Sequence, residues 1–109
     1  MCTAVVALAL VACGGSETAT YGVNATLVNG KPGFSVGTIT VTKGDKVQLR
    51  VDNDTDKDHG FSIDDFNIHR IVKPHTPQEF SFNANKVGQF RIYCQLHPAH
   101  QPAQLIVVD

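Results

Sequence analysis

One cysteine and two histidines stand close together near the end of the chain, as Cys94, His97 and His100. The spacing C-x2-H-x2-H follows an alternating segment and precedes the last apolar segment, so one thiolate and two imidazoles share a loop between two strands. Thiolate and imidazole together suit copper, zinc or iron. Pro98 stiffens this loop. The pattern predicts a metal site; the competing interpretation is a buried thiol beside two surface histidines.

A further ligand is expected from another part of the chain, and His59 is the best candidate. It stands after a polar turn and at the start of a predicted strand, and Gly60 beside it lets the backbone approach a site closely. His69 and His75 are the competitors. His69 lies in a segment of mixed pattern and His75 follows Pro74 in a polar turn, so we expect both to face solvent.

The amino-terminal segment predicts export. Residues 4–12 form an apolar run that is too short for a membrane span, which takes about 20 residues, and that suits the core of a signal peptide. Residues 10–13 (LVAC) resemble the lipobox of bacterial lipoproteins, in which Cys13 carries the lipid. We therefore expect a signal peptide over 1–13, a Gly/Ser/Thr-rich tether over 14–20 and one domain over 21–109, lipid-anchored in the periplasm or at the cell surface. The competing interpretation is a buried terminal strand or helix.

The cysteine count supports the metal site. Of the three cysteines, Cys2 would be lost with the signal and Cys13 would be lipidated, which leaves Cys94 as the only free thiol. One thiol cannot form an internal disulfide, and a free thiol is a liability in an oxidising compartment. A bound metal is the simplest explanation for it.

Composition and periodicity predict a single all-β domain. The 109 residues carry a net charge of −1, which gives no electrostatic basis for nucleic-acid binding. Apolar residues alternate over 38–42, 47–51, 80–82 and 90–94, and a short apolar strand is expected over 105–108. Turn residues separate these runs, as in a β-sandwich. Only residues 64–72 have a pattern that allows a helical turn.

The segment 52–58 places an acid at every second position. This resembles the opening of a calcium loop, but the glycine and the closing glutamate of such a loop are missing. We therefore favour a solvated acidic turn.

Taken together, the KGD turn at 43–45, the segment HGFSI at 59–63 and FRIYCQLHP at 90–98 resemble the cupredoxin family. Within that family they are most similar to red copper proteins of the nitrosocyanin type. The resemblance implies a Greek-key sandwich with one copper ion at its rim, bound by Cys94 and His97, with His100 as the second loop histidine. His59 occupies a position that is glutamate in nitrosocyanin and histidine in ordinary cupredoxins.

The resemblance also implies electron transfer with a redox protein partner. The usual axial methionine is absent, because the only methionine is Met1; His100 is the natural replacement, with Gln101 or Gln104 as weaker alternatives. Three other functions stay open: a copper enzyme acting on a small ligand such as nitric oxide or superoxide, a copper-delivery protein, and a zinc-binding protein. The identity of the redox partner and a homo-oligomeric state are left open as well.

Overall fold

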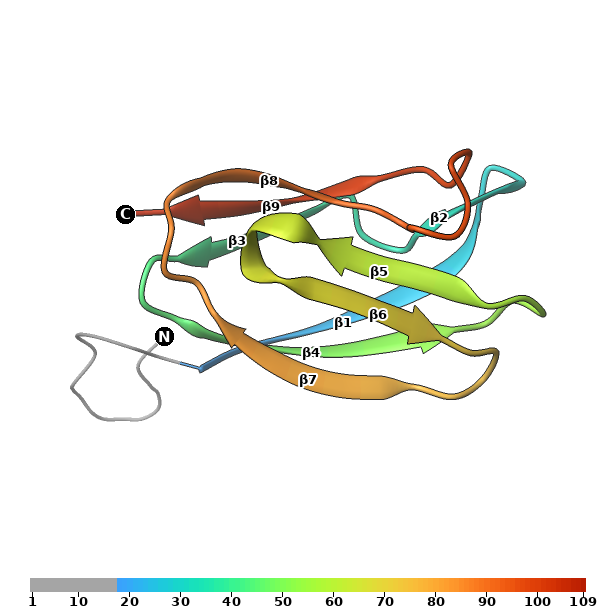
Figure 1. Ribbon diagram of the computed structural model, residues 1–109, viewed down its shortest axis with the longest axis horizontal. Helices are drawn as coiled ribbons and strands as arrows, with labels where there is room; N and C mark the ends of the chain where they lie inside the picture. Colours follow the sequence, from blue (N-terminus) through green and yellow to red (C-terminus); the bar gives the residue numbers. More distant parts are fainter. Residues whose placement is uncertain (1–17) are drawn as a thin grey trace.

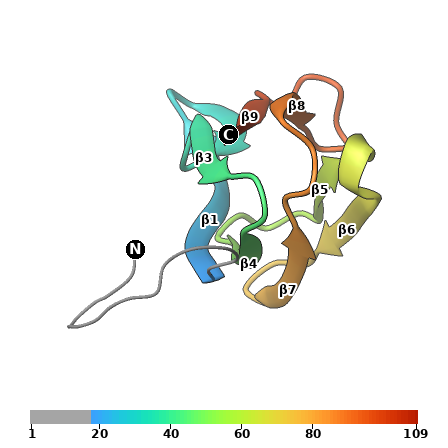
Figure 2. The ribbon, with the colours of Figure 1, turned by 90° about the vertical axis from the view of Figure 1, so that its left-hand side faces the viewer.

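Period-two alternation builds two facing β-sheets in the computed structural model, which describes residues 18–109. Val47, Leu49 and Val51 of one strand are completely or almost completely buried, while the residues between them are exposed or partly exposed. The strands are β1 (Thr18–Val28), β2 (Lys31–Phe34), β3 (Thr38–Thr42), β4 (Lys46–Asn53), β5 (His59–Ile63), β6 (Ile68–Val72), β7 (Gln78–Asn83), β8 (Gly88–Ile92) and β9 (Ala103–Val108). The end-on view in Figure 2 shows the two layers.

One layer has the strand order β2-β1-β4-β7, and the other contains β3-β9-β8. The β5–β6 hairpin extends this second layer, because Ser62 of β5 forms a bridge with Tyr93, just beyond β8. Two of the pairings are parallel, β1 with β4 and β3 with β9, and both join strands that are distant in the sequence. The predicted fold class, a Greek-key β-sandwich, is confirmed.

Phe61 anchors β5 in the core between the layers. Its ring is fully buried and makes edge contacts with Phe34 at 5.6 Å and Phe80 at 5.9 Å between ring centroids. Burying such a side chain stabilises the fold by roughly 1.5–3 kcal/mol. The contacts fix the position of β5, and with it the histidine that begins this strand.

One local expectation differs from the structure. The tether expected over 14–20 overlaps β1, which begins at Thr18, because residues 18–25 pair in parallel with β4. The helical turn that the sequence allows within 64–72 is present as the 3-10 turn η1 (Asp64–Phe66). Asn67 follows it with a left-handed φ of 56°, and the chain then returns as β6 against β5. The signal peptide and Cys13 lie outside the described residues.

The long axis of the sandwich separates the start of β1 and the C-terminus from the loops that carry the candidate ligands. Figure 1 shows the β1–β2 turn, the start of β5 and the β8–β9 loop together at one end, with the start of β1 and the C-terminus at the other. Gln101 N–H donates to Pro32 O at 2.9 Å, which ties the β8–β9 loop to the β1–β2 hairpin. Within the described residues, no helix is long and apolar enough to cross a membrane.

Candidate metal centre

The structure brings the predicted ligands together at the loop end of the sandwich. One ligand atom from each of His59, Cys94 and His100 lies within 4.8 Å of the others, and all three side chains are buried. His97 Nδ1 lies 3.5 Å from Cys94 Sγ. The His59 ring packs edge-on against the rings of His97 and His100, at centroid distances of 4.9 and 5.0 Å. Of the four side chains, only that of His97 is partly exposed.

Three-residue turns explain the C-x2-H-x2-H spacing. His97 N–H donates to Cys94 O at 3.4 Å, and His100 N–H donates to His97 O at 3.0 Å. Two successive turns of this kind return every third side chain to the same side of the loop. Before the loop, Tyr93 exchanges two backbone hydrogen bonds with Ser62 of β5, at 2.9 and 3.0 Å. The cysteine is therefore held directly beside the strand that carries His59.

The turn before His59 is organised by a buried amide, Asn53. Its Nδ2 donates to Lys57 O at 2.7 Å and to Val72 O at 2.9 Å, and its Oδ1 accepts from the backbone and hydroxyl of Thr55. These bonds join β4, the turn and β6, so that the chain enters β5 in one conformation. Asn53 was missed by the sequence analysis, which took this segment only as an acidic turn.

The acidic residues of that turn serve local contacts. Asp54 Oδ2 accepts from Asn24 Nδ2 and Thr26 Oγ1, both at 3.0 Å, while Asp52 pairs with Arg50. Asp54 therefore bonds to β1, and Asp52 to its neighbour on β4. This arrangement fits the surface turn that the sequence favoured over a calcium loop.

The two buried imidazoles each leave one nitrogen without a partner among the described residues, His59 Nδ1 and His100 Nε2. His100 Nδ1 donates to Gln101 O at 3.1 Å, which leaves the lone pair on Nε2. A buried polar atom without a partner costs free energy, and a metal ion would satisfy both nitrogens at once. The donor set of one thiol and three imidazoles fits copper, which takes such ligands.

The electrostatic surroundings keep these imidazoles neutral. Burial is the main cause that lowers the pKa of His59, and the neighbouring His100 and His97 lower it further. Burial also lowers the pKa of His100, against an opposing effect of the hydrogen bond to Gln101 O. Neutral imidazole is the form that binds metal.

The remaining sequence candidates lie away from this cluster. His69 is exposed and pairs with Asp64 at 2.9 Å, and His75 is also exposed, as expected. The Gln101 side chain donates to Val28 O at 3.1 Å, and that of Gln104 to the Thr38 hydroxyl at 3.4 Å. Both glutamine amides are therefore engaged elsewhere, and of the axial candidates only His100 lies in the cluster.

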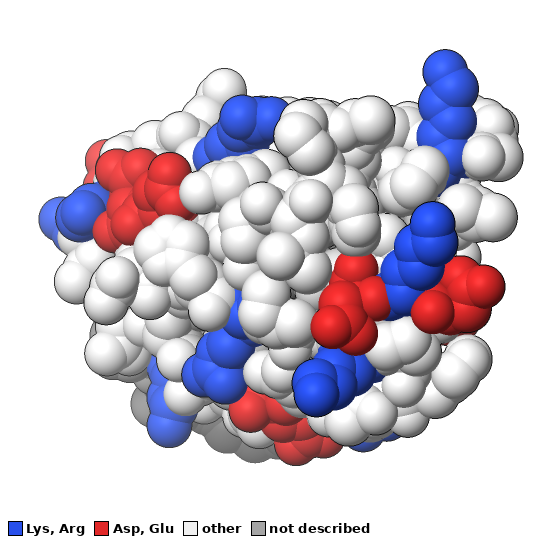
Figure 3. Space-filling model, turned by 45° about the vertical axis from the view of Figure 1, so that its right-hand side comes forward, with Lys and Arg blue, Asp and Glu red and all other residues white. Residues whose placement is uncertain are grey.

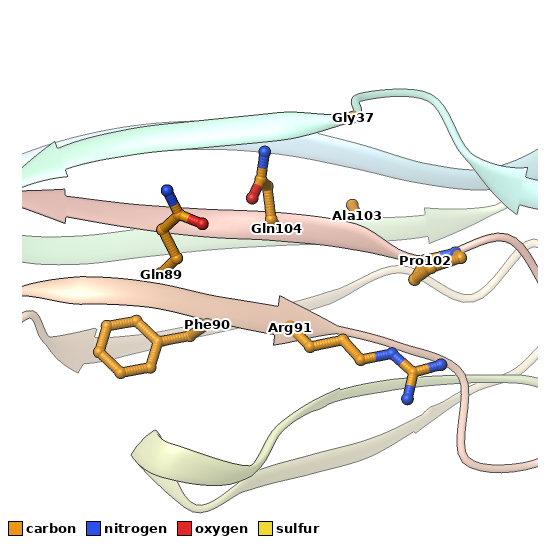
Figure 4. A pocket seen from close by; sticks show the side chains of 7 residues that line it. All are labelled: Gly37, Gln89, Phe90, Arg91, Pro102, Ala103 and Gln104. Carbon is orange, nitrogen blue, oxygen red and sulfur yellow. The ribbon is translucent and has the colours of Figure 1, made fainter.

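A hollow of about 310 Å³ lies against the histidines, lined by His59, His97 and His100 together with Leu27, Pro32 and the turn at 55–57. With the right-hand end of the molecule turned forward, uncharged side chains cover much of the centre of the face (Figure 3). Another hollow, of about 460 Å³, lies over β8 and β9. It is lined by polar and apolar side chains, among them Gln89, Arg91 and Gln104, and none of its lining residues belongs to the cluster (Figure 4).

Comparison with known families agrees with this geometry. The model of the cupredoxin-like domain family matches residues 1–107. The chain belongs to this family. Its candidate site combines a histidine from one strand with a Cys-x2-His loop from another part of the fold.

Two kinds of relative resemble this cupredoxin domain. It is 38% identical to nitrous-oxide reductase of Cupriavidus necator over 66 residues, 58% of this chain but only 10% of the reductase. The chain thus spans about a tenth of that relative. Among solved structures, copper nitrite reductase of Nitrosomonas europaea matches with a TM-score of 0.70 at 19% identity, over 84% of this chain and 41% of the other. Auracyanin A, a blue copper protein of Chloroflexus aurantiacus, matches with a TM-score of 0.66 at 14% identity, over 83% and 98%. At these identities the structures support the fold alone.

Proposed function

We propose that this cupredoxin-like domain binds one copper ion and carries electrons by cycling between Cu(I) and Cu(II), with the ligands His59, Cys94, His97 and His100. The observation that carries the proposal is the pair of buried, unpartnered imidazole nitrogens beside a buried thiol. When bound there, copper supplies one-electron redox chemistry.

The protein's part in electron transfer is to keep the donor atoms in place in both redox states. His59 is fixed by the core packing of β5, and the loop is tied to the β1–β2 hairpin through Gln101. A site that is held this firmly has little to rearrange when an electron arrives or leaves. His97 is the most exposed of the four, so its imidazole edge is the natural contact for a redox partner.

The proposed site is of the red copper, nitrosocyanin-like type. In place of the weak thioether of a blue site, His100 offers an imidazole whose Nε2 is free because Nδ1 is bonded to Gln101 O. Imidazole is the stronger donor to Cu(II). We therefore expect a lower reduction potential than that of a methionine-ligated site.

The test is metal analysis of the purified domain with visible spectroscopy and protein-film voltammetry. We expect one copper per chain, a strong charge-transfer band and one reversible couple. Zinc at full occupancy without a redox couple, after expression with both metals available, would contradict the proposal and favour the zinc alternative. A copper-delivery role would show itself as rapid release of copper to a competing chelator.

A copper enzyme acting on a small ligand is the second candidate. The hollow of about 310 Å³ against three histidines favours it, because a small molecule can reach the site from there. Nitric oxide or superoxide should then perturb the spectrum and be consumed catalytically. An unchanged spectrum under either ligand would leave electron transfer as the function.

For localisation, we propose that the domain is exported and held at the outer face of a membrane by a lipid on Cys13. The support is the LVAC motif together with the placement of the β1 start at the end of the fold opposite the metal centre. The partner would then be another exported redox protein. Mass spectrometry of the native protein should find a lipidated Cys13 at its start; an unmodified chain beginning at Met1 would contradict this.

A further inference from the structure

Gln95 directly follows the proposed ligand Cys94, and its side chain is hydrogen-bonded at both ends. Its Oε1 accepts from Ser62 Oγ at 2.6 Å, and its Nε2 donates to Arg70 O at 3.1 Å. Ser62 lies on β5 and is fully buried, while Arg70 lies on β6. The side chain therefore ties the ligand loop to both strands of the hairpin that begins with His59.

The same side chain lies over Gly60. A Cβ added to Gly60 would meet Gln95 Oε1 at 2.0 Å, Cδ at 2.4 Å and the backbone N at 2.9 Å. These distances are shorter than any van der Waals contact. A side chain at residue 60 would therefore have to displace the Gln95 side chain from the space that it occupies, and would also press on the Gln95 backbone N.

Gly60 in turn contacts the metal centre, since its N–H donates to Cys94 Sγ at 3.1 Å. A hydrogen bond to a thiolate withdraws electron density from sulfur, weakens its donation to Cu(II) and so raises the reduction potential. The strength of this bond depends on where the Gly60 amide is held.

We propose that Gln95 is a positioning residue of the metal centre: packed against Gly60 and bonded to Ser62 and Arg70, it holds the Gly60 amide on the Cys94 sulfur. The proposal rests on the proposed copper site for its redox consequence. The positioning itself is a property of the metal-free protein and can be measured there.

The first experiment compares Gln95→Ala with the matched control Gln104→Ala, which removes a surface glutamine amide that donates to the Thr38 hydroxyl. In the metal-free protein, Gln95→Ala should speed hydrogen exchange of the Gly60 amide at least tenfold and shift its NMR signal, and the control should do neither. Unchanged exchange and shift of the Gly60 amide in Gln95→Ala would overturn the proposal, whatever the protein does with copper.

The second experiment measures the reduction potential and the visible spectrum of the copper-loaded protein. In Gln95→Ala the hydrogen bond from the Gly60 amide to Cys94 Sγ should weaken, which favours Cu(II) over Cu(I). Each tenfold change in that preference lowers the reduction potential by about 59 mV. Loss of a residue that supports a ligand typically costs 10–100-fold in metal affinity. A changed Gly60 amide in a protein that never binds copper would reject the proposed function and keep the positioning. A copper site with the same potential and band in Gln95→Ala would reject the redox consequence.

A double-mutant cycle guards against a variant that fails to fold. Gly60→Ala alone should be destabilising, and Gly60→Ala combined with Gln95→Ala should recover part of the loss, since the two shortest contacts, with Oε1 and Cδ of Gln95, are then removed while the contact with the backbone N at 2.9 Å remains. Strictly additive losses would show that Gln95 does not occupy this space and would overturn the proposal.

Discussion

Replacing Asn53 with alanine should lower the free energy of unfolding of the metal-free domain by roughly 3–5 kcal/mol, although Asn53 is not itself a ligand. The side chain is 1% exposed and makes four hydrogen bonds. The bonds to Lys57 O and to Thr55 lie in a surface turn, where water can replace the lost partner. We assign about 1 kcal/mol to the bond with Lys57 and about 1 kcal/mol to the two bonds with Thr55 together.

The lost bond to Val72 O supplies the rest of the expected loss in the free energy of unfolding and its spread. Val72 is buried, and a carbonyl left without a partner there costs about 1–3 kcal/mol. Asn53→Asp should be at least as damaging at neutral pH, because it places a carboxylate oxygen against the carbonyls of Lys57 and Val72. The isosteric change thus separates the loss of hydrogen bonds from the loss of volume.

Urea unfolding of the metal-free variants measures these losses. Asn83→Ala on the exposed surface of β7 serves as the control and should stay within about 0.5 kcal/mol of the parent. Because Asn53 fixes the turn that leads into His59, copper affinity should fall in Asn53→Ala as well. A loss below 1 kcal/mol with an unchanged m-value would show that the turn is held by other contacts and would refute the reasoning.

Three further predictions concern the ligands. Cys94→Ser should abolish the strong visible band, because that band needs a copper–sulfur bond. Full colour in this variant would show that the metal binds at another site. His100→Met should raise the potential and strengthen the blue band, and an unchanged spectrum and potential in His100→Ala would remove His100 from the ligand set. The third concerns pH: the folded pKa values of His59 and His100 lie below the usual value of about 6.5, so the unfolded chain takes up protons first. Stability of the metal-free protein should be full above about pH 6.5 and fall as pH drops below it. A flat profile in the parent would contradict the neutral, buried imidazoles.

Local pattern predicted the strands whose one face is buried and missed the start of β1, where the sequence shows no such alternation. Segments such as 47–51 alternate because β4 faces the core on one side only. β1 offers no comparable signal at its start, since Thr18 to Thr20 form a strand through parallel pairing with residues 46–48. In 64–72 the decisive residue is Asn67, whose left-handed backbone ends the short turn and allows β6 to form.

The four candidate ligands could be singled out in the sequence because their chemistry is unusual, whereas the residues that support them are ordinary in type. Cysteine and histidine at three-residue spacing point to a metal in any exported domain, and the structure gathers all four predicted side chains. Asn53 and Gln95 are common polar residues whose role depends on contacts across the fold. The only sequence signal near them was Gly60, which indicated a close backbone approach without showing that Gln95 is the group that approaches.

The placement of the start of β1 and of the C-terminus opposite the proposed metal centre has a practical consequence for electrochemistry. Thr18 and Asp109 lie at one end of a body whose longest dimension is 44 Å, and the ligand loops lie at the other (Figure 1). A linker attached after Asp109 would fix the domain on an electrode with its metal centre facing the solution, out of reach of direct tunnelling from the surface. A surface cysteine near the β1–β2 turn would reverse that orientation and bring the centre to the electrode, so the attachment point alone would decide whether the film reports direct or mediated current.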